Sequence, residues 1–269
     1  MTTARFIRYQ LVDDGAIVRV VMDRPRTRNA QNRGLLVELG EAFERAEADD
    51  QVRVVILSGD GPSFSAGHDL GSAESIAERE PGPGQHPSYT CRGGTRPGLE
   101  PKWLQEWHYY FANTWCCDLI VAAEDTVFAD VVGTRLGMCG VEYFAHPWEF
   151  GPRLAKELLL TGDSLDAQTA AQLHMVSKVF PSAELADGTL ALARRIAQLP
   201  TMTALLIKDS VNRSVDAMGF NSALETAFGL HQLNHAQWTY LSGGRTAVGT
   251  SEFGLLPWKG GPPVQAKTT

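Results

Sequence analysis

The stretch from Val54 to Leu70, VVILSGDGPSFSAGHDL, determines the fold and the site that we expect for this chain. The segment from Val52 to Leu57, which is apolar except for Arg53, predicts a strand that is covered on both faces of a sheet. A dense turn signal follows, and the segment from Phe64 to Leu70 then places small residues around Gly67. A ligand can approach such a backbone closely and meet its N–H groups. This is the arrangement that binds a developing oxyanion.

The residues before this stretch complete a βα unit. Two segments, Phe6 to Val12 and Ala16 to Met22, flank Asp13-Asp14-Gly15 and predict a β-hairpin. A helix is expected next, with Asn29 or Asn32 as its N-cap. Its apolar positions follow helical spacing and are Leu35, Leu36, Leu39, Phe43 and Ala46.

Composition excludes several classes of function. The chain has 269 residues, 43% of them hydrophobic, which is enough for a full core. Its net charge of -7 disfavours nucleic acid or an anionic membrane as a partner. No apolar run is long enough to cross a bilayer, so we expect a soluble cytoplasmic protein. The cysteines show no metal-binding spacing, and Cys116 and Cys117 are expected to be small core residues.

Four ordered motifs resemble the crotonase family, which comprises the enoyl-CoA hydratases and isomerases. They are FSAGHDL at 64–70, the hairpin end Asp23-Arg24-Pro25 with Arg28-Asn29-Ala30, CDLIVAAEDTVFA at 117–129, and ELLLTGDSLDAQTAAQLHMVSKVFP at 157–181. The resemblance spans residues 6 to about 215. It implies an α/β fold with a crotonase-like ββα spiral core and a C-terminal helical oligomerisation region.

The resemblance also implies a coenzyme A site. The backbone N–H of His68 matches the first oxyanion donor of the family, and the arginine-rich loop matches the segment that lies along the adenosine end of coenzyme A. Phosphate contacts from Arg26 or Arg28 are therefore expected. The other residues that the family motifs place at the coenzyme are Ala30, Ser65, Ala66, Asp69 and Leu70. Coenzyme A would arrive as part of the substrate, with no separate cofactor and no metal.

One family segment has no counterpart in this chain. Relatives have a second strand and a glycine-rich turn that supplies another oxyanion N–H, followed by a helix with a catalytic glutamate. Here Phe111 to Trp115 lead directly to Cys116. Loss of one oxyanion donor typically costs ~2.7–4 kcal/mol of transition-state stabilisation. We expect either a rearranged core or an incomplete record of the natural chain.

The second family glutamate is absent as well, and other carboxylates are candidates for its role. Asp130 is the nearest to the expected position. Glu142 and His146 are four residues apart, so on one helix they would share a face and could form an acid/base pair. A surface pair or a buried histidine with satisfied hydrogen bonds is the alternative interpretation.

The C-terminal part predicts further helices. A helix from Ala155 to Leu160 ends at Gly162, Asp166 caps the next helix, and Val176 to Phe180 form a short strand. Three more helices are expected at 185–199, 203–215 and 220–240. Their apolar residues exceed what a small appendage can bury, which indicates packing against another subunit in a homo-trimer or hexamer. The expected regions are a core at 1–183, a helical region at 184–254 and a tail at 255–269.

The function that the resemblance implies is binding of an acyl-CoA thioester and hydration of a 2-enoyl-CoA. Two alternatives remain open. The first is a different acyl-CoA reaction, namely isomerisation, thioester hydrolysis or C–C bond cleavage. The other is a catalytically impaired family member that binds acyl-CoA without turnover, and the missing glycine turn supports it.

Overall fold

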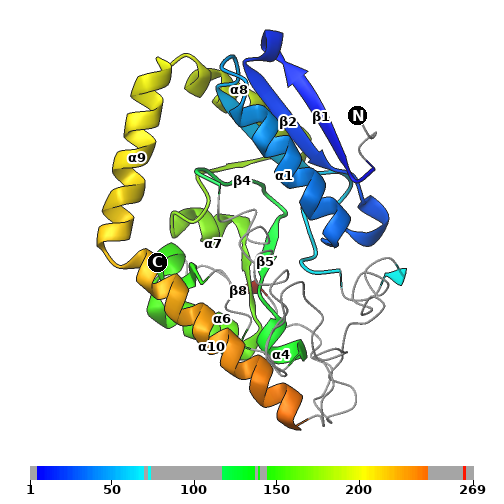
Figure 1. Cartoon of the computed structure of the whole chain (residues 1–269), viewed down its shortest axis with the longest axis vertical. Helices are drawn as coiled ribbons and strands as arrows, with labels where there is room; N and C mark the ends of the chain where they lie inside the picture. The colour runs from blue at the N-terminus through cyan, green and yellow to red at the C-terminus, as the bar shows by residue number, and fades with distance from the viewer. Residues whose placement is uncertain are drawn as a thin grey trace, which may run out of the picture. The chain divides into compact units, whose positions relative to one another are not determined.

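The computed structural model describes residues 5–69, 72–73, 117–136, 139, 144–241 and 263–264 of the chain (Figure 1). Its contacts divide the chain into two compact units. Unit 1 comprises Met1–Thr90 and Leu190–Val211, and unit 2 comprises Cys91–Thr189 and Asn212–Thr269. Each unit is described by itself. The region boundary expected near residue 183 stays a prediction.

The sheet of unit 1 has the order β1-β2-β3. Strands β1 (Ile7–Val12) and β2 (Ile17–Met22) pair antiparallel with Ile7 opposite Met22, which confirms the predicted hairpin. The connecting turn, Asp13–Gly15, has positive φ at all three residues, a conformation that Asp and Gly tolerate well. Strand β3 (Val54–Gly59) pairs parallel with β2.

The expectation that β3 is covered on both faces was wrong for the chain as described. All six of its residues are only partly buried, whereas β2 is almost wholly buried. Among the described residues β3 is the outer strand of this sheet. It also begins two residues later than expected, since Val52 donates to the Asp49 carbonyl in a turn.

Helix α1 (Arg33–Glu47) lies along the β1–β2 hairpin in Figure 1. Asn32 is its N-cap, because the Asn32 side chain accepts a hydrogen bond from the Leu35 N–H at 3.1 Å. The residues that the helix buries are Leu35, Leu36, Leu39, Ala42 and Ala46. Phe43, expected in this set, is 38% exposed, and Ala42 occupies the inward position instead.

We expect Asn32→Ala to lower the free energy of unfolding by about 1 kcal/mol, because the helix loses its N-terminal hydrogen bond. Chemical denaturation would measure the change. Asn32→Ser is the matched control, since its hydroxyl can still accept from the backbone. Equal destabilisation by both variants would contradict a capping role.

A two-stranded and a three-stranded sheet form the β-structure in the described part of unit 2. Strand β4 (Val121–Ala123) pairs parallel with β7 (Lys178–Phe180). Strand β5 (Val127–Ala129) pairs antiparallel with β6 (Ser164–Asp166), which is parallel to β8 (Pro263–Val264). Cys117, expected in the core before β4, is exposed.

Short helices of unit 2 surround these strands. They are α4 (Val132–Leu136), α5 (His146–Phe150), α6 (Pro152–Thr161) and α7 (Ala167–Gln172). Gly162 ends α6 in the left-handed conformation, and Asp166 caps α7 by accepting from the Thr169 N–H at 2.6 Å, as predicted. The buried core contains Ala122, Leu158, Leu165, Ala167, Ala170, Met175 and Val176.

Three longer helices follow, as expected. They are α8 (Leu185–Ala197), α9 (Thr201–Ala217) and α10 (Phe220–Leu241). Helix α9 buries none of its residues, and its exposed apolar side chains are Met202, Leu205, Leu206, Ile207 and Val211. Among the described residues no single helix meets the length and hydropathy needed to span a membrane. One pair bent by 105°, Ser182–Ala197 with Thr201–Ala217, does so by length and composition together.

Candidate functional site

The His68 backbone lies against the loop that follows the hairpin. Gln31 and His68 form an isolated parallel bridge, in which the Gln31 N–H donates to the Gly67 carbonyl at 2.8 Å. The Asp69 N–H donates to the Gln31 carbonyl at 2.9 Å. In a trans peptide the C=O and N–H point in opposite directions, so the His68 N–H faces away from Gln31. The bridge therefore sets the direction of the expected oxyanion donor.

Asn29 connects the two segments of this site. Its side chain accepts from the Arg24 N–H at 2.9 Å, and it donates to the carbonyls of Asp60 and Ser63 at 2.9 and 2.7 Å. It is fully buried and has a φ of 53°, which asparagine tolerates. From the sequence, Asn29 was considered as a helix cap and as part of the motif Arg28-Asn29-Ala30, but not as a link between segments. Its distant partners, more than 30 residues away, could not be inferred from local spacing.

A buried ion pair lies under the same bridge. The Arg24 guanidinium is 2.9 Å from the Asp69 carboxylate, and the two side chains are 7% and 5% exposed. Arg24 also donates to the Ala30 carbonyl. Ser72 donates to Asp69 through its N–H at 2.9 Å and its hydroxyl at 2.7 Å. The Asp69 side chain, expected to contact coenzyme A, is therefore engaged in contacts within the protein.

Burial and hydrogen bonding act in opposite directions on the pKa of the Asp69 carboxyl. Burial raises the pKa, but the hydrogen bonds from Ser72, together with the hydrogen bond and charge of Arg24, outweigh burial and lower it overall. A carboxyl whose pKa is lower in the folded state stabilises the fold above its unfolded pKa of about 4. That stability is lost as the pH falls through the folded-state pKa.

We therefore expect wild-type protein to lose more unfolding free energy than Asp69→Asn between about pH 6 and pH 2, because only the wild type must protonate this carboxylate. Urea denaturation across this range would measure both curves. Other acidic groups contribute equally to both proteins, so their difference isolates Asp69. Parallel curves would contradict the assignment.

The remaining expected coenzyme residues lie around the bridge. Arg26 and Arg28 are exposed, and the Arg28 carbonyl accepts from the Ala66 N–H at 2.9 Å. The Ser65 hydroxyl donates to the Asn29 carbonyl at 2.9 Å. Ala30 and Ser65 are half-buried and Ala66 is exposed, while Leu70 lies outside the described residues. The two arginine side chains are thus placed where a phosphate could reach them.

Unit 2 brings two other expected residues together. The His146 Nε2 atom lies 3.2 Å from the Asp130 carboxylate, with the side chains 5% and 26% exposed. The His146 ring is also 5.0 Å from the ring of Phe144 and 5.8 Å from that of Phe150, measured between centroids. A histidine held beside a carboxylate has the composition of an acid/base pair.

The pairing of His146 with Glu142 stays a prediction. Helix α5 begins at His146, and Phe144 and Ala145 precede it without helical structure. Proline at 147 suits the first turn of a helix, so α5 starts there rather than earlier. Glu142 itself lies outside the described residues.

Glu149 is a titratable group that sequence analysis missed. It lies on α5 in an apolar segment, and burial raises the pKa of its carboxyl. In the sequence, the position of this single glutamate between Trp148 and Phe150 was the one pattern that could have indicated a buried carboxyl. A carboxyl with a raised pKa near a histidine is a further acid/base candidate of unit 2.

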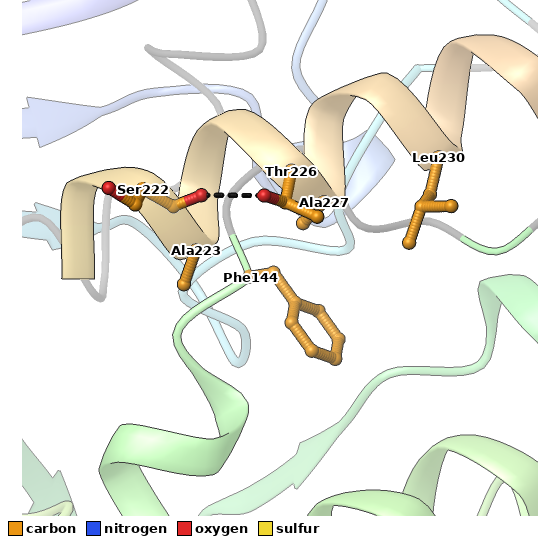
Figure 2. Close-up of a pocket in the computed structure, with 6 residues that line it drawn as sticks. All are labelled: Phe144, Ser222, Ala223, Thr226, Ala227 and Leu230. Atoms are coloured by element: carbon orange, nitrogen blue, oxygen red, sulfur yellow. Dashed lines mark hydrogen bonds between the residues drawn. The ribbon is translucent and has the colours of Figure 1, made fainter. Parts of the chain in front are cut away.

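An open apolar hollow of about 460 Å³ adjoins this part of unit 2. Figure 2 shows Phe144 facing one side of α10. The helix residues that line the hollow are Ser222, Ala223, Thr226, Ala227 and Leu230. The Thr226 hydroxyl donates to the Ser222 carbonyl at 2.8 Å, which leaves few polar groups on this surface.

Comparison with known proteins was decisive for the family. The model of the enoyl-CoA hydratase/isomerase family matches residues 13–88 and 112–239. The chain belongs to this family. EchA13 of Mycobacterium tuberculosis, whose name carries enoyl-CoA hydratase as a provisional designation, is 60% identical over 286 residues. That alignment covers 97% of this chain and 90% of EchA13.

Solved structures agree with the family assignment. A probable enoyl-CoA hydratase from Mycobacterium thermoresistibile superimposes with a TM-score of 0.73 and 32% identity, covering 88% of this chain and 99% of that one. A second, from Mycobacterium smegmatis, has a TM-score of 0.72 and 35% identity, covering 88% and 98%. The crotonase-type α/β fold predicted from the sequence is thereby confirmed.

Family membership bears on the missing segment as well. The alignment with EchA13 extends over 286 positions, more than the 269 residues of this chain, so EchA13 has residues without a counterpart here. The family model also leaves residues 89–111 unmatched. The absence of the second oxyanion segment stays a prediction, because residues 74–116 lie outside those described. Within the described residues, no group of three His, Cys, Asp or Glu side chains could hold a metal ion.

Proposed function

We propose that this member of the enoyl-CoA hydratase/isomerase family binds an acyl-CoA thioester and hydrates a 2-enoyl-CoA. The observation that carries the proposal is the bridge between Gln31 and His68, which directs the His68 N–H away from its own loop. A thioester oxygen placed there would receive a hydrogen bond as negative charge develops on it during addition of water.

Each unit, considered by itself, contains candidate groups for the remaining requirements of the reaction. Arg26 and Arg28 are exposed on the loop beside the bridge and would pair with coenzyme A phosphates. Asp130 with His146 is the candidate acid/base pair for activating water. The hollow beside Phe144 offers an apolar surface suited to an acyl chain. Coenzyme A would enter with the substrate, without a separate cofactor.

Binding without turnover is the second candidate function. The longer alignment of EchA13 and the unmatched residues 89–111 favour it, because a chain lacking the second oxyanion donor would stabilise the transition state less. Such a protein would retain the Arg26 and Arg28 loop and the Gln31–His68 bridge, and hence its affinity for acyl-CoA.

Calorimetric titration with a short 2-enoyl-CoA separates the two candidates. Sustained heat at catalytic protein concentration, with the 3-hydroxyacyl-CoA product identified by chromatography, supports hydration. A saturating isotherm without product supports the binding protein. If the titration shows no sustained heat and no saturating isotherm, both candidate functions are contradicted. A panel of other acyl-CoA thioesters tests isomerisation, hydrolysis and C–C cleavage in the same format.

We also propose that the chain assembles as a homo-trimer or hexamer through its C-terminal helices. Helix α9 supports this, since five of its apolar side chains are more than half exposed in the single chain. Apolar surfaces of this kind are usually covered by another protein. Light scattering of the purified protein would give the oligomer mass, and a monomer at micromolar concentration would contradict the proposal.

A further inference from the structure

We propose that Arg24 and Asp69 are positioning residues that hold the His68 N–H in the direction needed by the substrate. The inference rests on the proposed function for the identity of the substrate. It concerns an ion pair below the bridge rather than a group that touches the reacting atoms. Neither residue contacts coenzyme A in this assignment.

One guanidinium connects both segments of the bridge. Arg24 donates to the Ala30 carbonyl, directly before Gln31, and to the Asp69 carboxylate, directly after His68. The two bonded groups therefore flank the Gln31–His68 pair on opposite segments. A rigid planar donor with several N–H groups holds such a geometry better than a single ammonium group.

Burial limits Arg24 to this role. Its side chain is only 7% exposed, and the ring of Phe6 covers the guanidinium at 5.4 Å. Arg26 and Arg28 on the same loop are exposed. A phosphate could reach these two neighbours, whereas Arg24 faces the protein interior.

The geometry transmits this constraint to one peptide. The Gly67 carbonyl and the His68 N–H belong to the same peptide plane, and the Gln31 N–H holds that carbonyl. Gly67 has a φ of 81° and no atom within 4 Å of where a Cβ would lie, so packing does little to restrict it. The direction of the His68 N–H thus depends on keeping Gln31 and Asp69 at their present separation.

The ion pair has a structural role that apolar residues of equal volume would not reproduce. Buried ion pairs contribute little net stability, because desolvation offsets their attraction. Their directional hydrogen bonds can still define a geometry, as supporting residues do around other functional sites. Ser72 completes the arrangement by donating twice to Asp69.

Steady-state kinetics of Asp69→Asn and Arg24→Lys test the proposal. A misplaced oxyanion donor stabilises the transition state less but leaves substrate binding nearly unchanged. We therefore expect kcat to fall about 10- to 100-fold, while KM changes less than about threefold. Arg24→Lys keeps the charge and serves as the variant that remains folded if Asp69→Asn does not. Thermal unfolding of each variant excludes loss of folded protein as the cause.

Asp13→Asn is the matched control. Asp13 is also bonded to an arginine, since Arg194 donates to it at 2.7 and 2.8 Å, but the pair is exposed and remote in sequence from the bridge. This variant should keep the wild-type kcat. An equal loss in Asp13→Asn, or a rise in KM alone for the Asp69 and Arg24 variants, would overturn the proposal.

Amide hydrogen exchange tests the same inference without turnover. Exchange at residues 66–69 should accelerate at least tenfold in both positioning variants relative to strand β2 of the same protein. Unchanged exchange would overturn the proposal even if the wild type is active. Faster exchange in the two variants, in a protein whose wild type lacks hydratase activity, would support the positioning role and contradict only the proposed reaction.

Discussion

Substitution of His68 by proline is expected to lower kcat about 10²- to 10³-fold for a short 2-enoyl-CoA. Proline has no N–H, so the thioester oxygen loses the donor that the Gln31 bridge directs away from its loop. Stopped-flow measurement of the loss of the enoyl absorbance would give kcat and KM separately. The loss should be mainly in kcat, because the hydrogen bond strengthens as charge develops.

His68→Ala separates the backbone from the imidazole. Alanine keeps the N–H, so its loss of kcat should be less than about tenfold, clearly smaller than that of the proline variant. Circular dichroism and thermal unfolding would verify that both variants fold. Equal losses in the two variants would show that the side chain, and not the backbone donor, is the important group.

Substitution of the Asp130–His146 pair is expected to have the second large effect. His146→Gln should lower kcat about 10²- to 10⁴-fold, the range that a positioned general acid or base contributes. Asp130→Asn should also lower kcat, because the Asp130 carboxylate lies 3.2 Å from the His146 Nε2 atom and the substitution removes this partner of the pair. The double variant should lose little more than His146→Gln alone, since the two residues act as a unit.

Asp125→Asn is the control for this pair. Asp125 is a carboxylate of the same unit that accepts from the Ser182 hydroxyl at 2.7 Å on the exposed surface. Its turnover should match that of the wild type. A His146→Gln protein with wild-type kcat would make the pair a buried structural contact, the alternative interpretation of this histidine. Additive losses in the double variant would likewise argue against a joint role.

Local sequence patterns predicted the elements of the fold well. The Asp-Asp-Gly turn, the Asn32 cap, Gly162 and Asp166 each act through neighbours within a few residues, and the structure confirms each of them. Phe43 shows the limit, because helical periodicity does not distinguish the edge of an apolar face from its centre. Strand order, which places β3 outermost among the described residues, is likewise something that periodicity cannot supply.

The candidate site was harder to predict because its contacts are non-local. Asn29 bonds to carbonyls 31 and 34 residues later, and Arg24 bonds to a carboxylate 45 residues later. Spacing suggested Glu142, which lies outside the described residues, as the partner of His146, whereas the contact with Asp130, which follows β5, could be seen only in the structure. Motif resemblance identified the segments that carry these residues, while only the folded geometry distinguished the buried ion pair of Arg24 from the exposed side chains of Arg26 and Arg28.

The composition of unit 1 affects how the chain folds during synthesis. Its helical part, Leu190–Val211, is separated from the first 90 residues by about a hundred others. Arg194 pairs with Asp13, and Arg53 donates to the Leu199 carbonyl across this separation. At about 5–20 residues/s, Arg194 is synthesised roughly 9–36 s after Asp13, which lies 181 residues earlier. During that interval the nascent β1–β2–β3 sheet lacks these contacts. We therefore expect chaperones to bind the nascent chain most strongly in this interval.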